Sequence, residues 1–380
     1  MNPIDARSKT QPAAPPARRS DRSVVAVLKT RPETVVEDYG KLMRLAGYEK
    51  TLSKENDLLI KLNLSWTKYF PACSSQPWQL DGVAKTLLDD GFSPSKIFPV
   101  ENKTVVTNPV KGCRVNRWYP VLERHGLSFT PLPEVKWMTY QFRSPMLMLD
   151  KIFPKGIEIP EMYVGKSILH LPTVKTHGHS TTTGAVKNAF GGLLKEVRHY
   201  AHKHIHEVLV DLLIMQREIH PGVFAVMDGT VCGDGAGPRT MIPRIHNFIL
   251  ASADSVAIDA VAAKMMGYEP MSIPYIRMAT EMGLGNGNIS EIEILGEDVS
   301  GVNFHFTTKK SLVIWGDQLI RKGFLRPFER ILLHSPLVFW APIASNVYHD
   351  SIWYPIIGQR IINDFMKTEW GRLFQSYQES

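Results

Sequence analysis

The sequence predicts an α/β protein: a mostly parallel sheet, or sheets, flanked by helices in two α/β halves, with a C-terminal helical and aromatic arm. The first observation behind this prediction is that short apolar, β-branched runs alternate with amphipathic stretches of helical period. The second is that glycines follow several of these stretches, where a left-handed cap costs little. The third is composition, because 44% hydrophobic and 21% charged residues suit a packed chain of 380 residues and exclude disorder throughout.

The first half spans about residues 23–130 and alternates strands with helices. Its helical stretches end near Gly47 and Gly91. The order strand, helix, strand implies parallel strands joined by right-handed crossovers. The strands expected in this half are Val24–Leu28, Leu58–Leu62 and Lys96–Val100.

The second half spans about residues 164–300 and repeats the pattern. A long helical region is expected from about Gly184 to about His220. Residues 131–163 are rich in proline, methionine and aromatic residues without a clear period, which predicts an insertion or lid between the halves. Both halves form one α/β domain over residues 23–310. The other elements expected in the second half are strands at Ser167–Leu171, Val223–Met227 and Phe248–Ala251 and a helix at Val256–Met266.

Charge limits the partners and the location that we expect. Residues 1–22 contain five basic residues and two aspartates, so this tail, expected to be disordered, supplies +3 of the net charge of +7. The rest of the chain carries only +4 and shows no recognised binding motif, so no nucleic-acid partner is expected. The tail lacks an apolar signal core, which favours a cytoplasmic protein, peripheral to the inner membrane face if it touches a membrane at all.

The three cysteines, Cys73, Cys113 and Cys232, lie far apart and form no C-x-x-C pair. An iron–sulfur cluster, a zinc ribbon and a disulfide framework are therefore not expected. Reduced thiols agree with a cytoplasmic location.

The chemistry-bearing stretch is KTHGHSTTTGAVKNAFGG, from Lys175 to Gly192. It follows a predicted strand, and ligands of open parallel sheets bind at the carboxyl edge. We expect the hydroxyls of residues 180–183 to cap a helix that begins near Gly184. The N–H groups and dipole of that helix would attract a phosphate or carboxylate. The spacing is not that of a P-loop, and a capped surface helix with solvated lysines is the alternative.

The leading hypothesis is an enzyme that binds an anionic small molecule at this turn. Lys175 and Lys187 would clamp the anion, with Asn188 and Thr183 as further contacts. His177 would transfer a proton, because imidazole does so near neutral pH. We expect Asp228 to end its strand at the same edge and to act as a second acid–base group or metal ligand. The alternative for Asp228 is a turn-forming Asp-Gly pair.

Seven of the thirteen histidines lie between His170 and His206. On one straight helix, His199, His202 and His206 would share a stripe, and the i, i+4 pair His202 and His206 could hold a divalent metal ion. A metal-dependent isomerase or redox protein is therefore an alternative function. The remaining alternative for the stripe is a solvated helix face. Nothing else in the sequence indicates a cofactor.

In the C-terminal arm, residues 311–380, the composition shifts toward aromatic and aliphatic residues. Residues 331–348 form a nearly uncharged run, preceded by four basic residues and interrupted by Pro336 and Pro342. We expect the arm to pack on the domain. A contact of residues 323–380 with a membrane surface or a second copy is the alternative, and it would make the protein a non-catalytic binding module.

Several pieces together resemble the prokaryotic domain of unknown function family numbered 362. The resemblance spans roughly residues 24–296 and implies no established catalytic residues. Many members carry a ferredoxin-like insertion with clustered cysteines, which this chain lacks. The pieces that carry it are LPTVKTHGHSTTTGAVKNAFGG, the Asp228-Gly229 pair, GDGAGP, and ILASADSVAIDAVAAKMMG over Ile249–Gly267.

Overall fold

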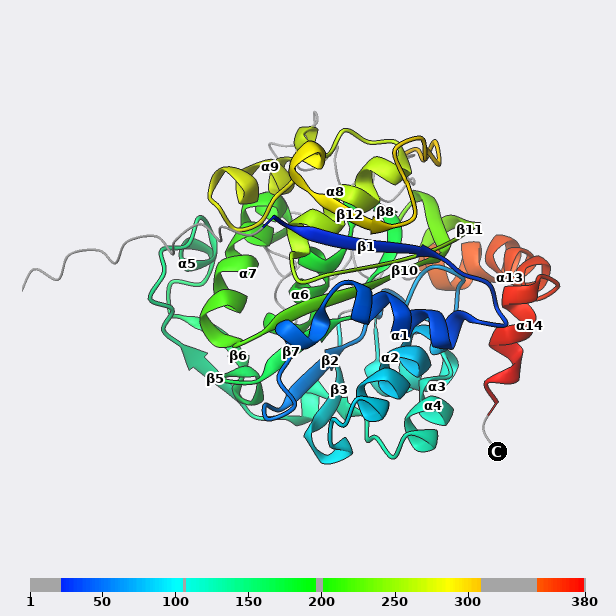
Figure 1. The fold of residues 1–380 in the computed structure, drawn as a ribbon, viewed down its shortest axis with the longest axis horizontal. Helices are drawn as coiled ribbons and strands as arrows, with labels where there is room; N and C mark the ends of the chain where they lie inside the picture. Colours follow the sequence, from blue (N-terminus) through cyan, green and yellow to red (C-terminus); the bar gives the residue numbers. More distant parts are fainter. Residues whose placement is uncertain (1–21, 105–106, 196–200, 309–346, 379–380) are drawn as a thin grey trace, which may run out of the picture.

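A mixed, mostly parallel sheet of ten strands forms the centre of the computed structural model, which describes residues 22–104, 107–195, 201–308 and 347–378 (Figure 1). The strand order is β12-β1-β11-β10-β7-β2-β3-β4, and β8 pairs with both β10 and β9. The predicted α/β class is confirmed. Both expected halves contribute to this one sheet, because β1 from the first half pairs with β11 and β12 from the second.

The first half folds as strand and helix in alternation. The pleat of β1 sends Val25 and Val27 to one face of the sheet and Ala26 to the other. Its elements are β1 (Val24–Lys29), α1 (Val35–Leu45), β2 (Leu58–Lys61), α2 (Pro77–Asp89), β3 (Ile97–Glu101), α3 (Pro109–Val115), α4 (Trp118–Arg124) and β4 (Thr130–Pro131).

The segment expected to be an insertion forms a small unit beside α7 (Ile205–Ile219). It contains the antiparallel pair β5 (Trp137–Tyr140) and β6 (Ile157–Pro160) and the short helix α5 (Leu149–Ile152). Asp211 on α7 accepts hydrogen bonds from the backbone N–H groups of residues 147–149, at 2.6 to 2.8 Å. This buried carboxylate therefore fixes the insertion to the domain.

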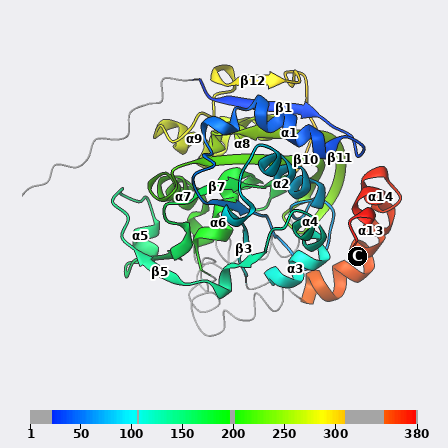
Figure 2. The same ribbon diagram turned by 60° about the horizontal axis from the view of Figure 1, so that its bottom comes forward.

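The second half completes the sheet. Its elements are β7 (Ser167–His170), β8 (Thr173–His177), β9 (Thr181–Thr183), α6 (Ala185–Leu193), α7, β10 (Val223–Ala236), β11 (Thr240–Ser252), α8 (Ser255–Met266), α9 (Pro274–Glu281) and β12 (Glu293–Gly296). Helices α6 to α9 share one hydrophobic core on one face of the sheet. Helices α1, α2 and α4 share the other core, in which α1 packs beside α2 (Figure 2).

Three local expectations were wrong. Residues 181–183 form β9 instead of a cap, and α6 begins after Gly184 without a side-chain cap. The long helix is divided, because α6 ends at Leu193 and α7 begins at Ile205. The strand expected to stop at Met227 continues to Ala236, paired along its length with β11, so Asp228 lies within the strand.

The described part of the C-terminal arm packs on the domain, as expected. It consists of the π-helix η10 (Val347–Gly358), α13 (Gln359–Phe365) and α14 (Glu369–Ser376), which lie at one end of the molecule (red in Figure 1). The indole of Trp370 donates to Asn247 at 2.8 Å, and Arg117 donates to the carbonyl of Gln375 at 2.6 Å. The basic tail before Arg22 and most of the uncharged run before Val347 lie outside the described residues. Among the residues that are described, we find no helix with the length and hydropathy needed to cross a bilayer.

Candidate functional site

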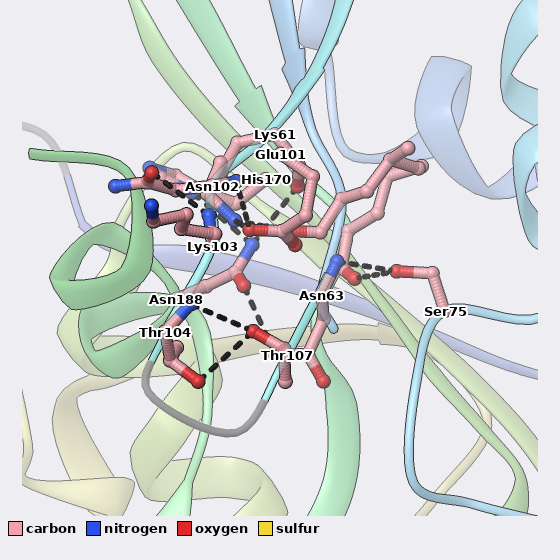
Figure 3. A network of polar contacts seen from close by, with 12 residues as sticks. Lys61, Asn63, Ser75, Glu101, Asn102, Lys103, Thr104, Thr107, His170 and Asn188 are labelled. Atoms are coloured by element: carbon pink, nitrogen blue, oxygen red, sulfur yellow. Dashed lines mark hydrogen bonds and ion pairs between the residues drawn. The ribbon is translucent and has the colours of Figure 1, made fainter. Parts of the chain in front are cut away.

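A polar network lies where the parallel strands β2, β3 and β7 reach their carboxyl ends (Figure 3). Lys61 and Glu101 are the last residues of β2 and β3, and their Nζ and Oε1 atoms are 2.8 Å apart. Both side chains are almost completely buried. A buried ion pair depends on both partners, because either charge alone would be strongly destabilising. The pair therefore fixes this edge of the sheet.

Asn188 on α6 joins the ends of β2 and β7. Its Nδ2 donates to the carbonyl of Lys61 at 2.9 Å, and its Oδ1 accepts from Nδ2 of Asn63 at 3.2 Å. His170, which ends β7, lies 3.4 Å from Nδ2 of Asn188 and 2.6 Å from Oε1 of Gln216. Burial lowers the pKa of His170 to about 3, so this ring is neutral. Asn188, expected to contact the ligand, thus holds the network together.

Lys175 on β8 is fully buried. Its Nζ donates to the carbonyl of Cys73 at 2.8 Å, to Oγ1 of Thr173 at 2.7 Å and to Oδ1 of Asn63. These three acceptors use all three N–H donors of an ammonium group. Burial lowers the pKa of Lys175 to about 8, so it stays mostly charged at neutral pH. Lys175 therefore anchors the loop after β2. It adds positive charge, but all three of its N–H groups are already bonded to the protein.

His177 ends β8 and is held in one tautomer. Its Nδ1 accepts from the backbone N–H of His179 at 3.1 Å and of Ser180 at 3.2 Å. A nitrogen that accepts cannot carry the proton, so these bonds assign the proton to Nε2. Burial, followed by nearby positive charge, lowers the pKa of His177 well below its ordinary value. The ring is therefore a neutral hydrogen-bond donor through Nε2.

Four further side chains form a chain of contacts that begins at this ring. The rings of His177 and His179 are 5.9 Å apart, as are those of His179 and His202, and His202 packs edge-on against Phe190 at 5.4 Å. The Nζ of Lys187 lies 5.6 Å from the centre of the Phe190 ring. We call residues 177, 179, 187 and 202 the basic cluster. Its lysine and histidines, with Lys175, are the charged groups that lower the pKa of His177, after burial.

His202 and His206 do not share an α-helix. Residues 201–204 form a 3₁₀ turn before α7 begins, so the i, i+4 spacing does not place His202 and His206 on one face of an α-helix. His206 instead stacks on Tyr275, with ring centres 6.2 Å apart. Within the described ranges, no group of three or more histidine, cysteine or acidic side chains is arranged to hold a metal ion. His199, the other member of the expected stripe, lies outside those ranges.

The N-terminus of α6 already contacts a carboxyl group, supplied by the chain itself. Asp259 on α8 accepts from the backbone N–H of Ala185 at 2.6 Å and of Val186 at 3.2 Å, and from the hydroxyl of Tyr275 at 3.0 Å. A Cβ on Gly184 would collide with this carboxylate, so glycine permits the approach. Burial raises the pKa of Asp259 to about 7. The dipole argument predicted the kind of group that binds here but not its source.

Thr183 lies on β9 opposite Lys175 and donates to its carbonyl at 3.3 Å. Two residues earlier, Thr181 adopts a left-handed conformation with a φ of 67°. This conformation is strained for a β-branched residue, and such strain occurs often at functional sites. The β8–β9 hairpin therefore holds His177 and Thr181, its last register pair, in a costly geometry.

Asp228 belongs to a different centre. It is fully buried and accepts from the hydroxyl of Tyr39 at 2.7 Å, from the indole of Trp78 at 2.9 Å and from both the backbone and the hydroxyl of Thr230. Tyr39 and Trp78 lie on α1 and α2, so these contacts join β10 to the helical layer. Burial raises the pKa of Asp228, while its four hydrogen bonds lower it.

Sequence reasoning missed Lys61, Glu101 and Asn63, and it left Asp259 open between a functional and a buried structural role. The first two sit inside otherwise apolar runs at strand ends, where a charged residue signals a buried pair or a site. Asn63 follows β2 directly. Asp259 lies in the apolar helix α8, and no spacing rule relates it to Ala185, 74 residues away.

Comparisons with known proteins give one family match and two distant similarities. Residues 58–264 match the family described as "Domain of unknown function (DUF362)". The thylakoid-associated protein sll1697 of Synechocystis sp. is 28% identical over 124 residues, which are 31% of this chain and 37% of that relative. The match thus spans little more than a third of the relative's length. A crystal structure of a Thermotoga maritima protein gives a TM-score of 0.35 at 10% identity and covers 67% of this chain and 60% of that one. Since the family match covers more than half of the 380 residues, this chain belongs to the DUF362 family.

Proposed function

We propose that this protein binds a small molecule with a phosphate or carboxylate group at the basic cluster. The observation that carries the proposal is the arrangement around His177. A hydrogen-bond donor fixed in one tautomer lies among side chains that are cationic or can become so, at the carboxyl end of a parallel strand. That edge is where ligands bind in open α/β sheets.

In this proposal each side chain has a separate task. Lys187 pairs with the anionic group, and His177 donates to one of its oxygens through Nε2. His202 adds positive charge when it is protonated. Lys175 and Asn188 keep the platform rigid, because their polar atoms are already bonded to the protein.

The tautomer of His177 also favours one kind of chemistry. Accepting a proton at Nδ1 would break the two backbone hydrogen bonds and give an imidazolium beside basic side chains, which the lowered pKa of His177 opposes. A neutral donor instead stabilises negative charge that develops on a ligand oxygen. If the bound anion is a substrate, we therefore expect His177 to polarise it and another group, or water, to move the proton.

Calorimetric titration of the full-length protein with inorganic phosphate, and with a series of small carboxylates, tests the proposal. Lys187→Ala should weaken the best-bound anion by about tenfold or more, the usual cost of losing a charge-assisted contact. Lys85→Ala is the matched control, because Lys85 is an exposed lysine on α2 paired with Asp89. Equal affinities in wild type and Lys187→Ala would contradict the proposal.

A further inference from the structure

A buried carboxyl group lies at the N-terminus of the helix that carries Lys187. Asp259 is 2% exposed and accepts from the backbone N–H groups of Ala185 and Val186, the first two residues of α6. Lys187 is the next residue of that helix. The positive end of the helix dipole stabilises a negative charge on Asp259 and also an anion beside Lys187. When both charges are present they repel each other, so each is stabilised less.

The hydroxyl of Tyr275 extends this contact to the hairpin that holds His177. It lies 3.0 Å from Oδ2 of Asp259 and 3.2 Å from Oγ1 of Thr182, the middle residue of β9. β9 pairs with β8, whose last residue is His177. Asp259 is therefore linked, directly or through one hydroxyl group, to both elements that position the proposed anion site.

The same hydroxyl groups accommodate Asp259 with and without a proton. As a carboxylate, Asp259 accepts from Tyr275. As a carboxylic acid, it donates from Oδ2 to the Tyr275 oxygen, and Tyr275 donates to Thr182, because a hydroxyl group can act as donor or as acceptor. Burial, together with the charge of Asp254 at the start of α8, raises the pKa of Asp259 to about 7, although the hydrogen bonds from α6 and Tyr275 lower it.

We propose that Asp259 couples anion binding at the basic cluster to the uptake of a proton from solvent. The anion binds more tightly when Asp259 is neutral, because no carboxylate then competes with it for the positive end of α6 and for Lys187. Linkage makes the effect reciprocal, so the bound anion raises the proton affinity of Asp259 by the same factor. This inference rests on the proposed function, since it requires an anion at the basic cluster.

Calorimetric titration of the full-length protein with inorganic phosphate and with acetate, at about pH 5.5, about pH 7 and about pH 8.5, tests the coupling. Buffers of different ionisation enthalpy give the number of protons taken up per anion. Phosphate and the histidines of the basic cluster can titrate over this interval as well. The comparison is therefore between wild type and Asp259→Asn, in which those contributions are the same.

Between about pH 5.5 and about pH 8.5, the affinity of wild type should fall at least about threefold more than that of Asp259→Asn. Near about pH 7, wild type should also take up more protons per anion than this variant. Asp89→Asn is the matched control and should behave like wild type. It removes an exposed carboxylate from α2, which lies on the other face of the sheet.

The outcomes distinguish the coupling from the anion site itself. Equal pH dependence and equal proton uptake in wild type and Asp259→Asn overturn the coupling and leave the site in place. Wild type that binds neither phosphate nor acetate at any of these pH values overturns both. If Asp259→Asn does not fold, Tyr275→Phe replaces it. This variant removes a donor to the carboxylate, so proton uptake should move to higher pH, and an unchanged pH dependence overturns the coupling.

Discussion

The two polar centres on the sheet differ in how their charges are balanced. Around Asp228, one buried carboxylate accepts four hydrogen bonds, from Tyr39, Trp78 and Thr230. Around His177, the groups that lower its pKa are lysines and histidines, and the ring is fixed by two backbone N–H groups that assign its proton to the second nitrogen. The hydrogen bonds of the first centre all come from the protein, whereas at the second centre we propose that an external anion accepts from that nitrogen.

The difference shows why burial and titratable chemistry alone do not identify a site. Asp228 and His177 are both buried at strands of one sheet, and the sequence assigned both to catalysis. A group whose hydrogen-bonding capacity is filled by neighbouring elements contributes to stability and to the alignment of those elements. A group oriented by the backbone, whose pKa is lowered by neighbouring lysine and histidine side chains, is the better candidate for binding.

The largest expected effect comes from replacing Asp228, the acceptor at the first of the two centres. Asp228→Ala removes the acceptor of Tyr39 and Thr230 and leaves the indole of Trp78 only the 3.3 Å contact with the hydroxyl of Thr230, so the free energy of unfolding should fall by about 3 to 5 kcal/mol. Urea denaturation measures this loss, with the exposed Asp89→Ala as control. The folded variant should bind the anion within about twofold of wild type. A stable variant that no longer binds would instead place Asp228 in the binding site.

An effect of about 4 kcal/mol, for a pKa difference of about 3, comes from the carboxyl group of Asp259 at the N-terminus of α6. The pKa of Asp259 rises from its ordinary value of 3.8 to about 7 in the folded protein. A carboxyl group with a raised folded-state pKa contributes stability that is fully present below the unfolded pKa and lost as pH rises through the folded pKa. Wild type should therefore lose this contribution between about pH 4 and about pH 8.

Asp259→Asn lacks this titration. As pH rises across the same interval, the free energy of unfolding of wild type should fall relative to that of the variant. Urea denaturation at several pH values checks the shift, with Asp89→Asn as the control that keeps a constant difference. A pH-independent difference for Asp259→Asn would mean that Asp259 stays ionised throughout.

The smallest expected effect concerns Thr183, and it tests whether the Thr183 hydroxyl serves only the β8–β9 hairpin or also contacts the ligand. Thr183→Val removes one long hydrogen bond, to the carbonyl of Lys175, and should cost less than about 1 kcal/mol of stability. Anion affinity should change by no more than about twofold. A loss of tenfold or more in the calorimetric titration would show that the hydroxyl contacts the ligand, as the sequence suggested.

The predictable part of the fold is the part set by local pattern. Expected strands such as Leu58–Leu62 and Ser167–Leu171 coincide closely with β2 and β7, because β-branched runs and turn residues act within a few positions. The continuous helix to His220 was not predictable in this way. Its apolar spacing persists through residues that the fold divides between α6 and α7. Periodicity records which residues are buried, not whether one helix carries them.

The site was only partly predictable for a similar reason. The turn after β8 was located correctly at a carboxyl edge, because strand order and helix position imply it. The partners of Lys175 and Asn188, however, come from β2 and the loop after it, more than 100 residues away. Hydrogen-bond saturation depends on such distant contacts. The sequence therefore identified the side chains of this region without showing which ones the fold itself uses.

The ring of His177 provides the most direct test of the binding proposal. Proton–nitrogen correlation spectra of the histidine rings, with His177→Gln to assign the signals, report the tautomer. We expect a neutral ring protonated at Nε2 from about pH 5.5 to about pH 8, and an Nε2–H signal that shifts when the best-bound anion is added to wild type but not to Lys187→Ala. An imidazolium at about pH 6, a proton on Nδ1, or a signal indifferent to phosphate and to carboxylates would contradict the account.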